Sequence, residues 1–334
     1  MPRACYKAWL NCQRLTLSDH VTTFYDERAR PIQVQRRNAR DGQELVTSQL
    51  SFSGQVEQSV SRHTGPNHAP VVVREVFSYD HAGRLLDTRQ QVVGSDPAPV
   101  LVAQQQYNEL GQLLGKTLAP GAKGLSQQVD YAYNPRGWLT GLNNACAPDP
   151  RDVFNLSLHY EQGFSKGYEQ YTGNLTGQTW RGRDGVQRAY GYVYDPASRL
   201  LQGDFVARTG GAASTSGAWN AELDHYRLSF VSYDENGNLA TLRRRGLLAG
   251  ATHARAQQYG PVDILSYAYA GNRLHAVDDA VSTNQLPRPA GYHGAPSSLA
   301  GDFQEQGAHQ GQEYLHDATG NTTQEKNKGI TGIA

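Results

Sequence analysis

Short segments in which hydrophobic and polar residues alternate recur along the chain, and each ends in a small polar turn. In Val129–Tyr133, the side chains of Val129, Tyr131 and Tyr133 fall on one face of a predicted strand, with smaller or polar residues between them. An Asp or Asn follows such segments, and its side chain can accept hydrogen bonds from the backbone N–H groups just ahead. A Gly three residues later permits a positive φ, and a Leu begins the return strand. The pattern predicts β-hairpins.

The clearest copies of this phrase run from a Tyr through Asp or Asn to a Leu. They are Tyr79–Leu85, Tyr107–Leu113, Tyr133–Leu139, Tyr194–Leu200 and Tyr233–Leu239. Weaker copies fill the gaps, some with a shortened turn and one with His316 in place of the Tyr. Repetition at a spacing of a few dozen residues is typical of arrays rather than of single-core folds. Because one hairpin is only marginally stable, the hairpins must stabilise one another by stacking.

The predicted site residues are structural and lie in the repeat turns and at their flanks. They are Tyr25, Asp26, Tyr79, Asp80, Gly83, Leu85, Tyr107, Asn108, Gly111, Leu113, Tyr133, Asn134, Gly137, Leu139, Tyr171, Gly173, Tyr194, Asp195, Leu200, Tyr233, Asp234, Gly237, Leu239, Tyr269, Gly271, Asp317 and Gly320.

Composition supports a β-rich chain and argues against several function classes. The chain has 334 residues with 31 basic and 31 acidic side chains, and no basic stripe indicates nucleic-acid binding. The 19 Tyr and 35 Gly residues suit pleated strands and tight turns, and this aromatic content with zero net charge argues against disorder. No apolar run approaches the roughly 18 residues of a membrane span. The N-terminus lacks the apolar core of a secretory signal.

Motifs that would carry chemistry are missing from the sequence. It contains no His-Glu-x-x-His, no Gly-x-Ser-x-Gly and no phosphate-binding Gly-Lys-Ser/Thr loop. The segment that starts at Asp234 resembles the opening of an EF-hand loop, but Leu239 and Arg245 occupy the positions that need Gly and Glu. We therefore expect no catalytic, cofactor-binding or metal-binding residues and no cofactor. The chain is not expected to be an enzyme.

The Tyr-Asp-x-x-Gly-Arg-Leu phrase at Tyr79–Leu85 resembles the repeat of the RHS/YD-repeat family. That family includes bacterial polymorphic toxins, Tc-toxin cocoon proteins and animal teneurins. The segments Val21–Asp26, Tyr171–Trp180 and Asn327–Ile330 resemble linking phrases of the bacterial RHS repeat-associated core subgroup. The resemblance extends over about residues 20–330 and implies a long β-sheet strip that coils into a hollow shell. In toxin members the shell encloses a C-terminal toxic domain, and in teneurin-like members the barrel serves adhesion.

These observations lead to an all-β fold: an antiparallel strip of β-hairpin YD repeats that curves into part of a hollow spiral shell. Residues 1–19 are expected to be a non-repeat segment. Residues 20–334 are expected to be the array, incomplete at its C-terminal end because the Asp-Pro-x-Gly closing segment of the family does not precede Ala334. The chain would then be a fragment.

The predicted function is a non-catalytic segment of an RHS-type shell that encloses or displays a C-terminal effector. Its expected partners are further repeats and an effector domain of the same polypeptide, with no nucleic acid and no membrane span. The full-length protein is expected to be secreted or at the cell surface, although no signal peptide is visible. An adhesion module that binds carbohydrate or a surface protein is the alternative, and a β-propeller-like enzyme is a weaker rival because the repeat spacing is irregular.

Overall fold

A computed structural model of the chain describes residues 13–14, 20–37, 42–65, 68–121, 126–143, 152–161, 169–208, 217–249, 258–281, 303, 311–330 and 332. Within these ranges nearly every regular element is a strand, and the single helical element is the 3-10 turn η3 (Lys326–Lys328). The prediction of an all-β, antiparallel fold is therefore confirmed. The predicted N-terminal segment 1–19 lies outside the described residues, apart from 13–14.

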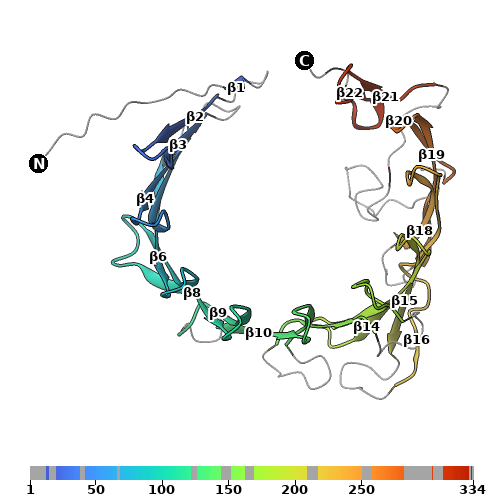
Figure 1. Cartoon of the computed structure of the whole chain (residues 1–334), viewed down its shortest axis with the longest axis horizontal. Coiled ribbons are helices and arrows are strands. Elements are labelled where there is room, and N and C mark those ends of the chain that lie inside the picture. The colour runs from blue at the N-terminus through green and yellow to red at the C-terminus, as the bar shows by residue number, and fades with distance from the viewer. Residues whose placement is uncertain are drawn as a thin grey trace, which may run out of the picture. The chain divides into compact units, whose positions relative to one another are not determined.

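The chain divides into two compact units, Met1–Tyr131 and Ala132–Ala334. The strands of the first unit are β1 (Gln13–Arg14), β2 (His20–Tyr25), β3 (Pro31–Arg37), β4 (Gln43–Leu50), β5 (Val56–Gly65), β6 (His68–Tyr79), β7 (Leu85–Val92), β8 (Val100–Tyr107), β9 (Leu113–Leu118) and most of β10 (Gln127–Tyr133), whose last two residues belong to the second unit. Each strand pairs antiparallel with the next in the chain, so these strands lie side by side in sequence order (Figure 1).

The second unit repeats this arrangement. Its strands are β11 (Leu139–Leu142), β12 (Asn155–His159), β13 (Gly177–Arg181), β14 (Gln187–Tyr194), β15 (Leu200–Arg208), β16 (Trp219–Ala221), β17 (Leu228–Tyr233), β18 (Leu239–Ala249), β19 (Gln258–Ala270), β20 (Arg273–Asp279), β21 (Tyr314–His316) and β22 (Thr322–Glu325). Neighbours from β11 to β15 and from β17 to β20 pair antiparallel, and β15 pairs with both β16 and β17. Strands β21 and β22 form a separate hairpin.

Most repeat hairpins share an irregularity beside the turn. Between β6 and β7, the register shifts between Ser78 and Tyr79, so that Tyr79 pairs with Leu85 across the turn. The same shift precedes Tyr107, Tyr194, Tyr233 and Tyr269. A bulge of this kind bends its strand and increases the local twist. The repeated phrase therefore encodes a bend as well as a turn.

The first unit is a single sheet layer. Cross-strand pairing places Val34, Val46, Val73 and Val92 on one face, with Ser61 between the second and third, and all four Val side chains are half-buried. Among the described residues of this unit, no hydrophobic side chain is fully buried, and Val100 on the same face is 56% exposed. Hydrogen bonds along the strands and contacts between neighbouring hairpins, rather than a closed core, therefore hold this unit together.

The second unit contains a buried core. Phe205, Val206 and Ala207 of β15 and Val262 of β19 are almost completely inaccessible to solvent. A smaller cluster joins Leu265, Val277 and Tyr314 near the C-terminal end of the described chain. Burial of aliphatic and aromatic side chains of this size contributes about 1.5–3 kcal/mol each. The second unit consequently has a source of stability that the described part of the first unit lacks.

Candidate functional site

The turn after Tyr79 shows how the repeated phrase folds. The backbone N–H of Asp80 donates to the carbonyl of Arg84 (2.9 Å), and the N–H of Gly83 donates back to the carbonyl of Asp80 (3.0 Å). One carboxylate oxygen of Asp80 accepts the N–H groups of Ala82 and Arg84, each at 2.9 Å. The other oxygen accepts Nε of Arg84 at 2.6 Å. The Asp side chain therefore holds the whole turn together.

Most other repeat turns use this same arrangement. An Asp, Asn or Ser side chain accepts backbone N–H groups ahead of it in the turns that begin at Asp26, Ser51, Asn108, Asn134, Asp195, Asp234 and Asp317. The fourth residue of each turn has a positive φ, for example +82° at Gly83 and +85° at Gly237. Ala29 and Ser198 occupy this position with φ values of 58° and 62°.

These hydrogen bonds set the proton affinity of the turn carboxylates. The pKa of Asp80 is lowered, chiefly because the backbone N–H of Arg84 donates to its carboxylate, and the pKa values of Asp26 and Asp195 are lowered in the same way. The pKa of Asp234 is lowered chiefly by the side-chain amide of Asn238. A carboxylate whose oxygens already accept several donors is a poor general base, so these residues suit structure rather than catalysis.

The side chain in the fifth turn position connects one turn to the next. In the first unit, Nη1 of Arg30 donates to the carbonyl of Ser51 (3.0 Å), and Nη1 of Arg84 donates to the carbonyl of Asn108 (3.2 Å). Between them, Nε2 of Gln55 donates to the carbonyl of Gly83 (3.1 Å). These bonds link four successive turns in a row. We call this row of linked turns the turn ladder.

The second unit has its own turn ladder. Nδ2 of Asn238 lies 3.2 Å from Oδ1 of Asn272, and Nη2 of Arg273 donates to the carbonyl of Ala318 at 3.3 Å. The guanidinium of Arg199 lies over the ring of Tyr233, 4.7 Å from its centroid. A cation placed over an aromatic face at this distance contributes about 0.5–1 kcal/mol at exposed sites.

The repeat Tyr residues form a second connection between neighbours. The hydroxyl of Tyr233 donates to the carbonyl of Leu200 (2.9 Å), and that of Tyr269 donates to the carbonyl of Leu239 (2.9 Å). In the first unit, the hydroxyl of Tyr79 donates to the carbonyl of Val56 (2.8 Å). Each acceptor is the first residue of the preceding repeat's return strand. The Tyr and Leu positions of the phrase therefore connect successive repeats as well as flanking each turn.

Some predicted positions differ from this arrangement. Tyr171 is 60% exposed in an irregular segment, its hydroxyl bonds Glu169, and Gly173 lies against the ring of Trp138. Tyr160, which is not among the predicted site residues, donates its hydroxyl to the carbonyl of Leu139 (2.8 Å) as the repeat Tyr residues do. Its neighbours lack the Asp-x-x-Gly turn, so only the alternation of Leu156, Leu158 and Tyr160 could have indicated it. Gly271 lies in a short turn between the paired residues Ala270 and Arg273.

Aromatic side chains also gather on one face of β13–β15. The ring of Tyr190 stacks near those of Trp180 and Tyr192, with centroids 5.7 and 5.9 Å away, and packs edge-on against Phe205 at 5.3 Å. Burial raises the pKa of Tyr190 to about 12, and its hydroxyl donates to the carbonyl of Tyr226 (2.7 Å). Tyr190 therefore contacts aromatic rings on both neighbouring strands, Trp180 of β13 and Phe205 of β15.

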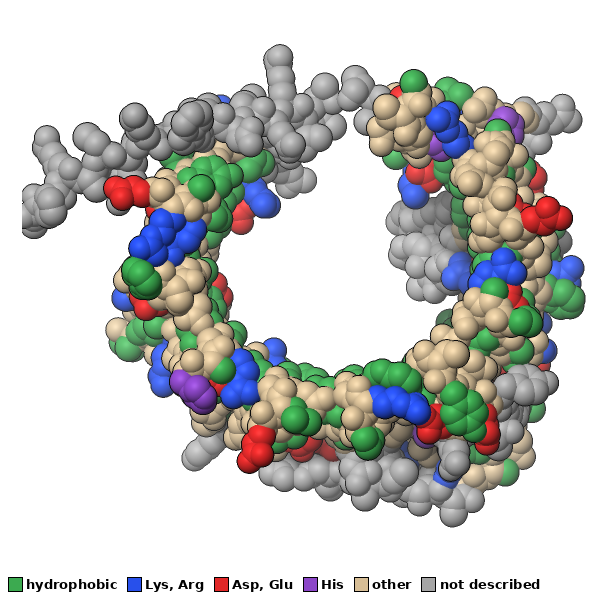
Figure 2. Space-filling model, in the orientation of Figure 1, with side chains coloured by type: hydrophobic (Ala, Val, Ile, Leu, Met, Phe, Trp, Pro, Cys, Tyr) green, Lys and Arg blue, Asp and Glu red, His purple; other side chains and the backbone are tan. Residues whose placement is uncertain are grey.

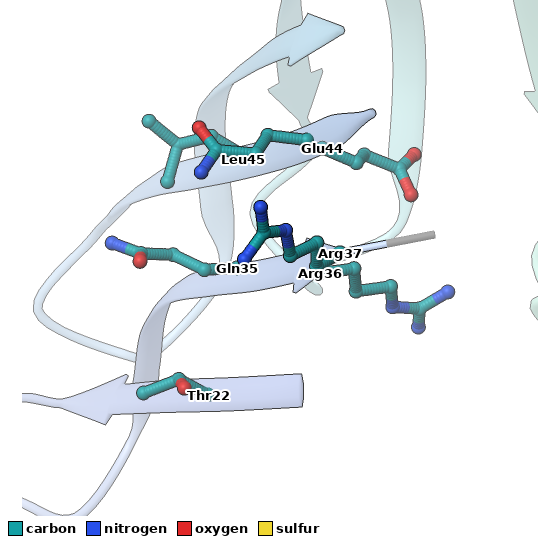
Figure 3. A pocket seen from close by; sticks show the side chains of 7 residues that line it. Thr22, Gln35, Arg36, Arg37, Glu44 and Leu45 are labelled. Atoms are coloured by element: carbon teal, nitrogen blue, oxygen red, sulfur yellow. The ribbon is translucent and has the colours of Figure 1, made fainter. Parts of the chain in front are cut away.

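A polar hollow of about 230 Å³ lies over the ends of β3 and β4. Figure 3 shows its lining, in which Thr22, Gln35 and Leu45 form one cross-strand row and Arg36, Arg37 and Glu44 lie beside it. The lining lacks a nucleophile paired with a base. In the described part of the chain, no group of three or more His, Cys, Asp or Glu side chains is arranged to hold a metal ion.

Charged side chains of both signs are interspersed with hydrophobic ones along the face seen in Figure 2. This agrees with the balanced charge of the sequence. Within the described ranges, no helix is long and apolar enough to cross a membrane.

No family model matches the chain, and no curated protein matches it. The solved structures that match the chain include the following three. TcdB2-TccC3-Cdc42 matches at 13% identity with a TM-score of 0.49, over 91% of this chain and 17% of the solved chain. TcdB2-TccC3 matches at 13% identity with a TM-score of 0.48, over 93% and 19%. TcdB2-TccC3 without its hypervariable C-terminal region matches at 13% identity with a TM-score of 0.27, over 91% and 19%. The chain thus spans less than a fifth of the solved chains.

Proposed function

We propose that this chain is a non-catalytic wall segment of an RHS-type β-shell that encloses or displays an effector domain. The turn ladder is the observation that carries this proposal. A strip whose turns are linked one to the next can be extended by adding repeats without redesigning a core. The repeated phrase resembles RHS/YD repeats, and this resemblance is the reason to propose that the strip forms part of a shell.

The chemistry of the turns supports a structural role. In the repeat turns, both carboxylate oxygens of the Asp accept hydrogen bonds from groups of the same turn, as in Asp80 and Asp195. Their lowered pKa values leave them ionised at neutral pH, so they serve as hydrogen-bond acceptors. We therefore propose no enzymatic activity for the chain and no cofactor.

The partners follow from the same proposal. The wall would pair with further YD hairpins and with an effector domain of the same polypeptide, in a protein that is secreted or displayed at the cell surface. The half-buried valine face of the first unit suits contact with another apolar surface, because exposed Val side chains such as Val100 gain free energy when they leave water.

The test begins with the reading frame beyond the codon for Ala334. We expect it to encode more YD hairpins and then an unrelated domain. The whole product is then expressed, and the unrelated domain is probed by limited proteolysis. Protection of that domain in the wild type, and its loss when Arg84 and Arg199 are both replaced by Met, is the expected result. A downstream domain that is cleaved at the same rate with or without the shell would refute enclosure.

A further inference from the structure

A row of buried polar side chains crosses three strands of the second unit. Asn155 of β12 pairs with Arg181 of β13, and Arg181 pairs with Gln187 of β14. Directly paired residues in an antiparallel sheet lie on the same face. The exposed fractions of these three residues are 2%, 6% and 6%. We call Asn155, Arg181 and Gln187, together with Arg208 described below, the buried polar row.

The polar groups of this row are only partly satisfied. Nε and Nη2 of Arg181 are inaccessible to solvent and bond no acceptor among the described residues, and Oε1 of Gln187 is equally buried with no donor in the same part of the chain. A guanidinium stays protonated in proteins, so Arg181 brings a full positive charge into this layer. A buried charge without a counter-charge is destabilising by several kcal/mol. The row therefore combines unused donors, an unused acceptor and uncompensated positive charge.

Arg208 adds a second guanidinium to the row. Its neighbour Ala207 pairs with Arg188, and successive residues on a strand point to opposite faces, so Arg208 lies on the face of Gln187. Nε of Arg208 is also buried without a partner, and its guanidinium lies over the ring of Trp219 at 4.6 Å. With strands about 4.8 Å apart, the Arg181 and Arg208 backbones are about 10 Å apart. Gln187 of β14 lies between these two residues on the same face.

Carboxylates on neighbouring segments have other bonds. Oδ2 of Asp152 accepts Nδ2 of Asn155 at 2.9 Å, and no ion pair joins Asp152 to Arg181 within the described residues. On the opposite face of β14, Arg188 is paired with Asp184 and Glu222, so those two carboxylates are also engaged. Among the described residues no ion pair to Arg181 is found, so a bound anion can supply its counter-charge.

We propose that the buried polar row binds a phosphate group. The guanidinium groups of Arg181 and Arg208 donate hydrogen bonds to phosphate oxygens. Arg recognises oxyanions in this way because two of its N–H groups can donate side by side. Oε1 of Gln187 accepts a hydrogen bond from the P–OH group of hydrogen phosphate. Sulfate and simple carboxylates are fully deprotonated at neutral pH and offer Gln187 no donor. The site consequently prefers hydrogen phosphate to sulfate.

The test is a calorimetric titration of the full chain with inorganic phosphate and, separately, with sulfate at matched ionic strength. Arg181→Met keeps the length of the side chain and removes its charge. Arg183→Met is the matched control, because Arg183 is an exposed residue that follows the same strand. We expect saturable phosphate binding by the wild type and Arg183→Met, with sulfate weaker. We expect affinity to fall about tenfold or more in Arg181→Met, since a charged donor is lost.

A second variant keeps the test informative if Arg181→Met fails to fold. Gln187→Glu places a carboxylate directly across from Arg181. We expect it to raise the Tm in phosphate-free buffer by about 2 °C or more, because it supplies the missing counter-charge, and to abolish phosphate binding. Phosphoserine titrated in parallel tests the contact with Gln187, because its phosphate is mostly a dianion without a P–OH group at neutral pH. We expect it to bind more weakly than inorganic phosphate, and tighter binding of phosphoserine would contradict the proposed role of Gln187.

Three results would overturn the proposal: no saturable phosphate binding by the wild type, equal binding by wild type and Arg181→Met, or a lower Tm in Gln187→Glu. None of these depends on whether the chain forms part of a shell.

Discussion

Gly83 and Gly237 occupy the same position in two repeat turns, and together they allow the energy of the turn ladder to be measured. Their φ values are almost the same, +82° and +85°. Their surroundings differ. A Cβ added at Gly83 would lie 2.7 Å from Nε2 of Gln55, whereas one added at Gly237 would meet nothing closer than Arg199 Nη1 at 3.9 Å. Replacement by Ala therefore produces the same backbone strain at both sites but a clash at Gly83 alone.

The two costs can be estimated separately. A left-handed conformation costs a non-Gly residue about 1–2 kcal/mol. Ala29 adopts such a conformation in its own turn with a φ of 58°, so the lower end of that range is expected. At Gly83, the end of the Gln55 side chain must also move, which breaks its 3.1 Å hydrogen bond to the Gly83 carbonyl. Loss of that bond adds about 0.5–1.5 kcal/mol. Gly83→Ala should thus be the more destabilising change by that amount.

Hydrogen exchange followed by mass spectrometry is the appropriate assay, because it reports the opening free energy of each hairpin separately. Peptides that span each turn are compared in Gly83→Ala, Gly237→Ala and the wild type. The same Gly83 change is then made in a Gln55→Ala background, where its effect should fall to that of Gly237→Ala. Equal effects of the two Gly changes with Gln55 present, or no effect of Gly237→Ala, would refute this account of the turns.

Two other features give direct tests. Tyr233→Phe should lower the opening free energy of its hairpin by about 1 kcal/mol, because the Leu200 carbonyl loses its donor, while Tyr107→Phe, whose hydroxyl bonds no described residue, should change little. Lowering the pH should destabilise the turns, because the pKa of Asp80 is lower in the folded protein than in the unfolded chain. The contribution of ionised Asp80 to the free energy of unfolding is complete above the ordinary Asp pKa of about 3.9, and it is lost as the pH falls through the lower folded value. Asp80→Asn should flatten the fall in Tm between pH 5 and pH 2, and an unchanged profile would contradict the assignment.

The sequence carries enough information for the all-β fold because its decisive contacts are local. Asp80 and Gly83 lie three residues apart, so their turn chemistry is visible in one short phrase. Contacts between repeats are different. That Gln55 would bond Gly83 depends on which turns become neighbours and on the bulge that aims each side chain. Tyr160 was missed for the same reason, since its partner Leu139 belongs to the preceding hairpin while its own segment lacks the turn phrase.

The buried polar row was beyond prediction from the repeated phrase. Asn155, Arg181 and Gln187 lie outside the repeat turns, and only strand register brings them into line. The positive φ values of Ala29 and Ser198 were also not predicted. Ala and Ser do not favour this conformation, and the geometry of the turn imposes it.

The single-layer construction of the first unit has a mechanical consequence. Each inner strand of this unit pairs with two neighbours, and the turn ladder adds one bond between successive turns. A pulling force at the edge therefore loads one strand at a time. We expect the strands of such a sheet to detach one after another in many small steps at low force, and not in a single event at high force. The same strip can therefore be stable at rest and still be unravelled in order from one end.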